Sequence, residues 1–131
     1  MMFPLPKTQP VQPLLPVHDP SVRVDEDGLV FNREAAELIG ISPSSRVVIV
    51  QEESNPINMY VQVVRTAGYP LHKKNKRLLL HSHSLARRIL NNATVEGSKA
   101  VFRLGEPTHN ITGERIVPII TRINYAERNK V

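Results

Sequence analysis

The stretch 24–50, VDEDGLVFNREAAELIGISPSSRVVIV, decides the fold of this chain. Gly28 ends an acidic turn between two short apolar segments, which is the pattern of a tight hairpin with a positive φ at the glycine. Asn32 is a favourable N-cap and Gly40 is a favourable residue to end a helix, so one short helix is expected between them. A β-branched run closes the stretch. The expected elements are strands over 21–25, 29–31 and 46–51 and a helix over 33–39.

The remainder of the chain repeats these kinds of element with different residues. A strand returns after a loop that contains Pro56, and a basic run then leads into a second apolar triplet at 78–80. Ser82 or Ser84 can cap a second short helix. Pro118 lacks an N–H, so we expect its strand to lie at a sheet edge or to carry a bulge. The expected elements are strands over 59–65, 99–104 and 114–121 and a helix that ends at Leu90.

The order strand, helix, strand, strand thus occurs twice, at an offset of about 50 residues. Repeats of this size usually bury their apolar faces against each other. This predicts one compact domain over 21–131, built from pseudo-repeats at about 21–66 and 77–122 with a basic linker at 70–77. The alternative is a chance similarity among short elements, since the identity between the two copies is low.

The first copy carries a resemblance to a known family. Val24-Asp25-Glu26-Asp27-Gly28, the apolar triplet, the short helix and Leu38-Ile-Gly-Ile41 are similar to the AbrB/SpoVT-type swapped-hairpin domain, in which a Val-Asp-x-x-Gly turn precedes a short helix and a hairpin. The match covers residues 24–64, and a second copy spans about 77–121. Some members carry both copies in one chain and form a pseudo-dimeric barrel. The resemblance implies an α+β fold, mostly β: a small swapped-hairpin-like β-barrel of two pseudo-repeats, each with a short helix.

The family commonly binds DNA, often as transition-state regulators or antitoxins, so the resemblance also implies where DNA would lie. DNA-binding members usually carry a basic residue after the turn glycine, where this chain has Leu29. They often carry paired arginines on the short helix, where the first copy has Ala36 and Glu37 and the second has Arg87 and Arg88. DNA contacts are therefore expected from the second copy and the basic linker, with the first copy as a scaffold or partner surface.

Composition limits the function classes. The chain has 131 residues, a net charge of +5 and no cysteine, which excludes a disulfide scaffold and a thiol nucleophile. No apolar run reaches the roughly 18 residues that a membrane helix needs, and no secretory signal is visible. We expect a cytoplasmic protein without a membrane partner.

The charge is unevenly distributed along the chain. Residues 1–20 carry no net charge, residues 21–69 carry −3 and residues 70–131 carry +8. This asymmetry favours an anionic partner for the second half, although an acid–base contact between halves or subunits would explain it equally well. Lysine and arginine neutralise phosphates and release counterions, so basic clusters are candidate DNA contacts. The candidates are Lys73, Lys74, Lys76, Arg77, Arg87 and Arg88. The competing interpretation is a solvated linker and a solvated helix face.

The first twenty residues predict an extended arm rather than part of the domain. They hold six of the eleven prolines, which preclude a helix or a central strand and favour an extended, polyproline-like chain. Four apolar side chains are candidates for contact with a partner or a neighbouring subunit, namely Phe3, Leu5, Leu14 and Leu15. The alternative is a leader without a binding role.

No enzymatic site is expected. His81 and His83 could share a metal on one strand face, but a third ligand is needed, and His72 and His109 qualify by residue type alone. The acidic turn before Gly28 lacks the spacing of a calcium loop, and no glycine-rich phosphate loop occurs. We therefore expect no catalytic residue, no metal and no cofactor.

Two principal functional hypotheses remain, with an enzyme of unrecognised type as a third alternative. The first is a non-enzymatic nucleic-acid-binding or regulatory module that contacts DNA phosphates through its basic second half. The second is a structural or assembly protein, for example a virion accessory or a complex-stabilising subunit, whose N-terminal arm docks on neighbouring subunits. A homo-oligomer fits both hypotheses.

Overall fold

The computed structural model describes residues 19–121, which form ten strands and two helices within that range. All strand pairs are antiparallel. The elements are β1 (Ser21–Asp25), β2 (Gly28–Phe31), α1 (Arg33–Ile39), β3 (Arg46–Gln51), β4 (Met59–Val64), β5 (Tyr69–Pro70), β6 (His72–Lys74), β7 (Arg77–His81), α2 (His83–Asn92), β8 (Ala100–Leu104), β9 (Thr108–His109) and β10 (Arg115–Ile120).

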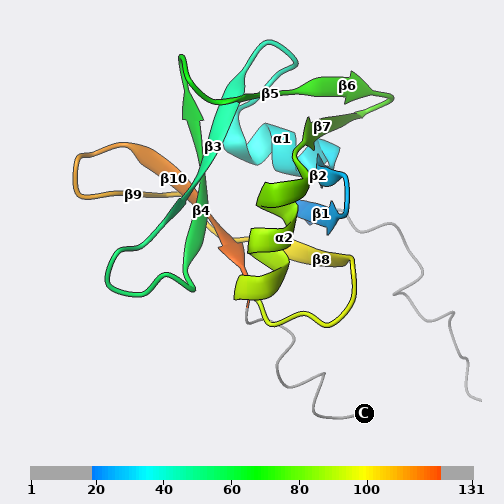
Figure 1. Cartoon of the computed structure of the whole chain (residues 1–131). Coiled ribbons are helices and arrows are strands. Elements are labelled where there is room, and N and C mark those ends of the chain that lie inside the picture. The colour runs from blue at the N-terminus through cyan, green and yellow to red at the C-terminus, as the bar shows by residue number, and fades with distance from the viewer. Residues whose placement is uncertain (1–18, 122–131) are drawn as a thin grey trace, which may run out of the picture.

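The strands form one sheet that turns back on itself (Figure 1). The order is β5-β3-β4-β10-β8-β1-β2-β7-β6, with β9 attached to β10 alone. The two ends of this order are consecutive in the chain, because the buried Leu71 joins β5 to β6. The result is a nearly closed antiparallel barrel, which confirms the expectation of a mostly β, barrel-like fold.

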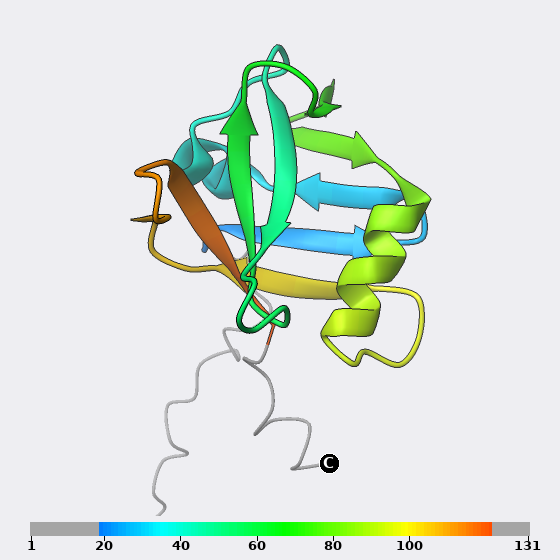
Figure 2. The same ribbon diagram turned by 60° about the vertical axis from the view of Figure 1, so that its left-hand side comes forward.

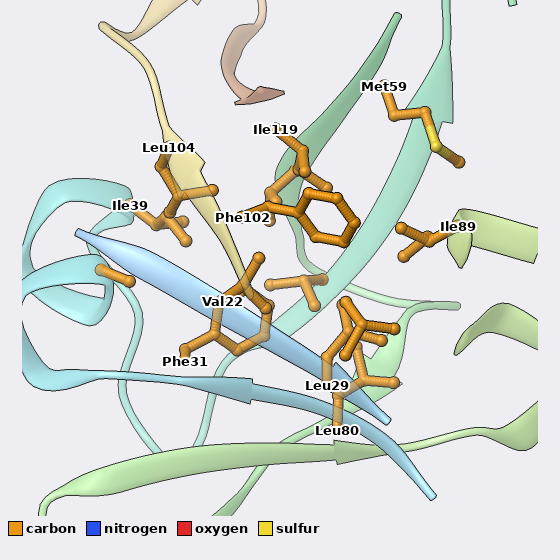
Figure 3. Close-up of a cluster of buried hydrophobic side chains, with 14 of the residues drawn as sticks. Val22, Leu29, Phe31, Ile39, Met59, Leu80, Ile89, Phe102, Leu104 and Ile119 are labelled. Atoms are coloured by element: carbon orange, nitrogen blue, oxygen red, sulfur yellow. The ribbon is translucent and has the colours of Figure 1, made fainter. Parts of the chain in front are cut away.

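Two layers of strands and two helices enclose the core. Figure 2 shows β7, β2, β1 and β8 side by side, with β3, β4 and β10 crossing in front of them. Helices α1 and α2 follow the antiparallel neighbours β2 and β7, so they lie at opposite ends of that layer. Both helices and nearly every longer strand contribute apolar side chains to one cluster (Figure 3), and no polar or charged residue within 19–121 is buried. The burial of this cluster is the main stabilising term of the fold.

The helices form where their caps predict them. Asn32 Oδ1 accepts a hydrogen bond from the Ala35 N–H at 2.7 Å, and Gly40 ends α1 in the left-handed conformation with φ of 86°. Ser82 Oγ accepts from the Leu85 N–H at 3.2 Å at the start of α2, which extends to Asn92, two residues beyond the expected end.

Gly28 is required by a close approach of two backbones. Its φ is +147°, and a Cβ at this position would lie 1.9 Å from the Leu80 carbonyl oxygen on β7. The N–H of Ser82 donates to the Asp27 carbonyl at 3.0 Å next to it. The turn glycine therefore lets the β1–β2 hairpin pack directly against the junction of β7 and α2.

Of the two arrangements expected for the strand that contains Pro118, the edge position is wrong, and the register shows the extra residue of a bulge. Between the pairs Leu104–Ile119 and Thr108–Ile116, the three residues 105–107 lie opposite the two residues 117–118. Strand β10 lies inside the sheet, between β4 and β8. The Pro118 carbonyl accepts from the Gly105 N–H at 2.9 Å, and the only residues of β10 that pair with β8 are Ile119 and Ile120. In an antiparallel strand the N–H and C=O of one residue point to the same side. The missing N–H of Pro118 therefore faces Gly105, the residue after β8, and the ladder to β4 does not need it.

Candidate nucleic-acid interface

Four of the six candidate DNA-contacting residues lie on one hairpin. We call β6, β7 and the turn between them, residues 72–81, the basic hairpin. Lys73 and Lys74 belong to β6, Lys76 lies in the turn and Arg77 opens β7 and pairs with Lys74. Asn75 permits the two-residue turn with a positive φ of 59°. The segment predicted as a basic linker thus forms the end of the sheet.

The cationic side chains point to both faces of the basic hairpin instead of lying on one face. Leu78 and Leu80 point into the core, so Arg77 and Lys74 point outward, together with His72 and His81. The rings of these two histidines have centroids 5.0 Å apart. By alternation along β6, Lys73 points to the opposite side, where it is also exposed. These side chains could therefore contact a polyanion from either face of the hairpin.

Lys73, Lys74, Lys76 and Arg77 are all exposed, and none of them forms an ion pair with another residue within 19–121. By contrast, Arg23 and Arg103 lie within 4 Å of carboxylates on their side of the barrel. Four cations within five residues repel one another at low ionic strength. A bound phosphate chain would relieve this repulsion, which gives the basic hairpin an electrostatic preference for polyanions.

Arg87 and Arg88 lie elsewhere. Both side chains are exposed on α2, opposite the buried face of Leu85, Ala86 and Ile89. Strand β7 separates α2 from the turn of the basic hairpin. The five residues of this strand span about 16 Å. The six candidates therefore form two separate groups.

Two arginines that sequence analysis did not select lie near the segment that leads into the basic hairpin. Arg46 pairs with Pro70 and with Val64, and its Nη1 donates to the Gly68 carbonyl at 2.9 Å. Arg65 follows Val64 directly, so both arginines border the chain that leads into β6. One signal could have identified Arg65, because residues 54–95 contain seven lysines and arginines and no acidic residue, but Arg46 lies outside that range.

The opposite end of the β2–β7 pair is acidic. Gly28 pairs with His81, so the turn formed by Glu26 and Asp27 lies at the α2 end of β7. His83 is engaged there, because its Nδ1–H donates to the Glu26 carbonyl at 2.9 Å. A depression of about 560 Å³ beside this turn is lined by side chains of both signs. A second depression is lined by Lys74 together with Asp25 and Asp27, so basic and acidic side chains share this outer face of the layer.

The other sequence candidates do not converge. Within residues 19–121, no three histidine or carboxylate side chains lie close enough to share a metal ion. His109 lies on β9, paired with Arg115, and His72 and His81 contact each other. The arm residues Phe3, Leu5, Leu14 and Leu15 lie outside the described residues. Asp19 and Pro20, the last two arm residues, are held at the barrel by hydrogen bonds to Asn32 and Leu104.

No helix within the described residues combines the length and apolar character needed to cross a membrane. No protein-family model, curated protein sequence or solved structure matches this chain.

Proposed function

We propose that this chain is a non-enzymatic nucleic-acid-binding module of regulatory type, which contacts DNA phosphates through the basic hairpin. The observation that carries the proposal is the group of four exposed lysines and arginines on residues 73–77, none of them paired with a carboxylate within 19–121. Lysine and arginine contacts to phosphates supply affinity that is independent of base sequence and falls with salt.

The strand pairing supports the tandem swapped-hairpin arrangement that is part of this proposal. Strands β2 and β7, each followed by a short helix, pair with each other in antiparallel register, and so do β4 and β10, each of which ends its unit. Strand β1 pairs with β2 and also with β8, while β5 and β6 pair with β3 and β7. This exchange of neighbours supports a swapped-hairpin arrangement in which the linker strands β5 and β6 act as the leading strand of the second unit.

The two units would then contribute differently to binding. The turn of the β1–β2 hairpin carries Glu26 and Asp27, whereas the turn of the basic hairpin carries Asn75 and Lys76. Only the second unit suits a phosphate backbone. We therefore propose that DNA is contacted by the second unit alone, with the first unit as a scaffold. Arg87 and Arg88 then form at most a second, separate contact.

A structural explanation of the lysines competes with this proposal. Strand β6 ends the sheet order, and lysines on such strands prevent the pairing of edges between molecules. Charge reversal separates the two explanations, because Lys74→Glu with Lys76→Glu keeps the edge charged but repels phosphates. The DNA proposal predicts that this variant stays as soluble as the parent and loses DNA binding. Unchanged DNA binding would leave edge protection as the role of the lysines.

The proposal is tested with a fluorescent duplex of random sequence at about 50 mM salt. Neutralising two phosphate contacts by Lys74→Gln with Lys76→Gln should weaken binding on the order of 100-fold at that salt concentration. Arg87→Gln with Arg88→Gln removes the same charge from α2 and should weaken binding about threefold or less if the hairpin is the principal contact. Equal losses in the two variants would show that binding follows net charge and would refute the hairpin as the site.

A second candidate function is supported by the exit point of the N-terminal arm. The Asn32 Nδ2–H donates to the Asp19 carbonyl at 3.0 Å, and the Leu104 N–H donates to the Pro20 carbonyl at 3.0 Å. The arm therefore leaves the barrel beside β8 at a fixed place, which suits an assembly protein whose arm docks on neighbouring subunits. Deletion of residues 1–18 should then abolish association while the thermal unfolding midpoint stays unchanged. Association that survives the deletion would exclude an arm-mediated assembly.

A further inference from the structure

The β9–β10 hairpin projects from one side of the barrel (Figure 1) and ends in a tightly bonded turn. Asn110 Oδ1 accepts hydrogen bonds from the N–H groups of Thr112 and Glu114 and from the Thr112 hydroxyl, at 2.8–3.1 Å. Glu114 Oε1 in turn accepts from Asn110 Nδ2 at 3.1 Å and from the Thr112 hydroxyl at 3.1 Å. These contacts hold the five residues of the turn in one conformation.

Ile111 lies at the tip of this turn with its side chain 100% exposed. This side chain therefore contributes no buried apolar area to the stability of the fold, although hydrogen bonds order the turn around it. A β-branched side chain on a preorganised turn loses little conformational entropy when it enters an apolar recess. Ile111 therefore has the properties of a side chain that inserts into a recess of a partner protein, and we call it the knob.

A recess that could receive such a knob lies at the base of the same hairpin. The depression has a volume of about 340 Å³ and is lined by Ile39, Gly40, Gln62, Val63, Glu114 and Arg115. Its apolar lining includes Val63, which is 41% exposed. Arg115 fixes the recess to the barrel, because its Nη1 and Nη2 donate to the carbonyls of Ile39 and Leu38 at 3.0 and 2.7 Å. The recess is open to solvent, and its lining is about equally polar and apolar.

We propose that two copies of this chain associate about a two-fold axis, with Ile111 of each copy inserted into the recess beside Val63 of the other. The knob and the recess lie close together on one molecule, because Glu114 and Arg115 of the hairpin line the recess together with residues of α1 and β4. One two-fold rotation therefore satisfies both contacts at once, as an isologous interface requires. Glu114 and Arg115 are neighbours of opposite charge at the rim. The same rotation exchanges them, so that the carboxylate of each copy can face the guanidinium of the other.

This interface uses no residue of the basic hairpin, and a dimer would present two basic hairpins to one nucleic acid. The inference does not rest on DNA binding, because self-association can be measured with the protein alone. Failure of either proposal would leave the other standing.

Cysteine cross-linking tests the geometry directly, because the chain contains no cysteine of its own. Ile111→Cys and Val63→Cys variants are mixed in equal amounts and oxidised mildly. The proposed dimer predicts that the heterologous disulfide between positions 111 and 63 forms at least about tenfold faster than either homologous disulfide. Predominant pairing of position 111 with itself, or no disulfide between these positions, would overturn the proposed arrangement.

Sedimentation velocity of the full chain over a range of concentrations tests the energetics. Truncation of a central anchor weakens an interface about tenfold or more, and a symmetric dimer contains the anchor twice, so Ile111→Ser should weaken the dimer about 100-fold. Val101→Ser is the matched control, since Val101 is 56% exposed on β8, outside the recess. It should leave the dimer unchanged. A parent chain that is monomeric at all concentrations, or an Ile111→Ser variant that dimerises as well as the parent, would refute the proposal.

Discussion

Replacement of Gly28 by alanine is expected to be among the most damaging single changes in this protein. The new Cβ would lie 1.9 Å from the Leu80 carbonyl oxygen and 2.9 Å from the Ser82 backbone nitrogen. Ordinary contact begins at about 3.4 Å, so the β1–β2 hairpin and β7 must separate by about 1.5 Å. Both neighbours are backbone atoms, so no side chain can rotate away to relieve the clash.

The expected loss combines three terms. Alanine at a positive φ costs about 1–2 kcal/mol. Displacement of the packed layers costs about 1–3 kcal/mol, as overpacking does elsewhere. Loss of the hydrogen bond from the Ser82 N–H to the Asp27 carbonyl costs about 1 kcal/mol. The sum, about 3–6 kcal/mol, is comparable to the whole stability of many single domains.

Urea unfolding followed by circular dichroism measures this loss. Gly97→Ala is the matched control, because Gly97 also has a positive φ, 105°, but nothing lies within 4 Å of a Cβ at that position. It should cost only the conformational term, about 1–2 kcal/mol. If Gly28→Ala destabilises the protein by no more than Gly97→Ala does, the close approach of β2 and β7 described above is wrong.

Three further predictions concern the caps and turns. Asn32→Ala should lower the free energy of unfolding by about 2 kcal/mol, more than the roughly 1 kcal/mol for Ser82→Ala, because Asn32 also bonds Asp19 and Ser21; equal losses in urea unfolding would contradict this. Hydrogen bonds from Asn110 and Thr112 lower the pKa of Glu114, so their contribution to stability is present above the unfolded pKa of about 4.3 and is lost as the pH falls through the lower, folded pKa. Asn110→Ala should therefore destabilise the protein more at pH 7 than at pH 3, and equal losses would contradict the assignment. Arg115→Met should cost about 1–3 kcal/mol through the loss of both hydrogen bonds to the end of α1, and a neutral result would contradict that role.

Local signals predicted both helices and the β1–β2 and β3–β4 hairpins, but not the strands β5, β6 and β9. The ends of α1 coincide with the expected range, because Asn32 and Gly40 act through hydrogen bonds within a few residues of themselves. Non-local pairing explains what was missed. Gly68 and Pro70 indicate a break in the chain, yet Pro70 pairs with Arg46 and thereby forms β5, which helps to close the barrel.

The sequence predicted the charges of the candidate site but not where the fold places the charged residues. The basic run at 72–77 is visible in the sequence, but its place at the end of the sheet depends on pairing with β7. The separation of Arg87 and Arg88 from that run follows from the length of β7, which the predicted triplet 78–80 underestimated. Arg65 lies only seven residues before the basic hairpin, but Arg46 is distant from it in sequence, and pairing with Pro70 brings Arg46 to the strand that leads into the hairpin.

The salt dependence of DNA binding is the measurement that tests the central claim most directly. If the four cations of the basic hairpin each neutralise one phosphate, the plot of log affinity against log salt has a slope of about −3.6, and affinity falls about 150-fold between roughly 50 and 200 mM salt. The variant with Lys74→Gln and Lys76→Gln should halve the slope to about −1.8. A slope near zero for the parent chain, or the same slope in both proteins, would contradict the assignment of the basic hairpin as the nucleic-acid contact.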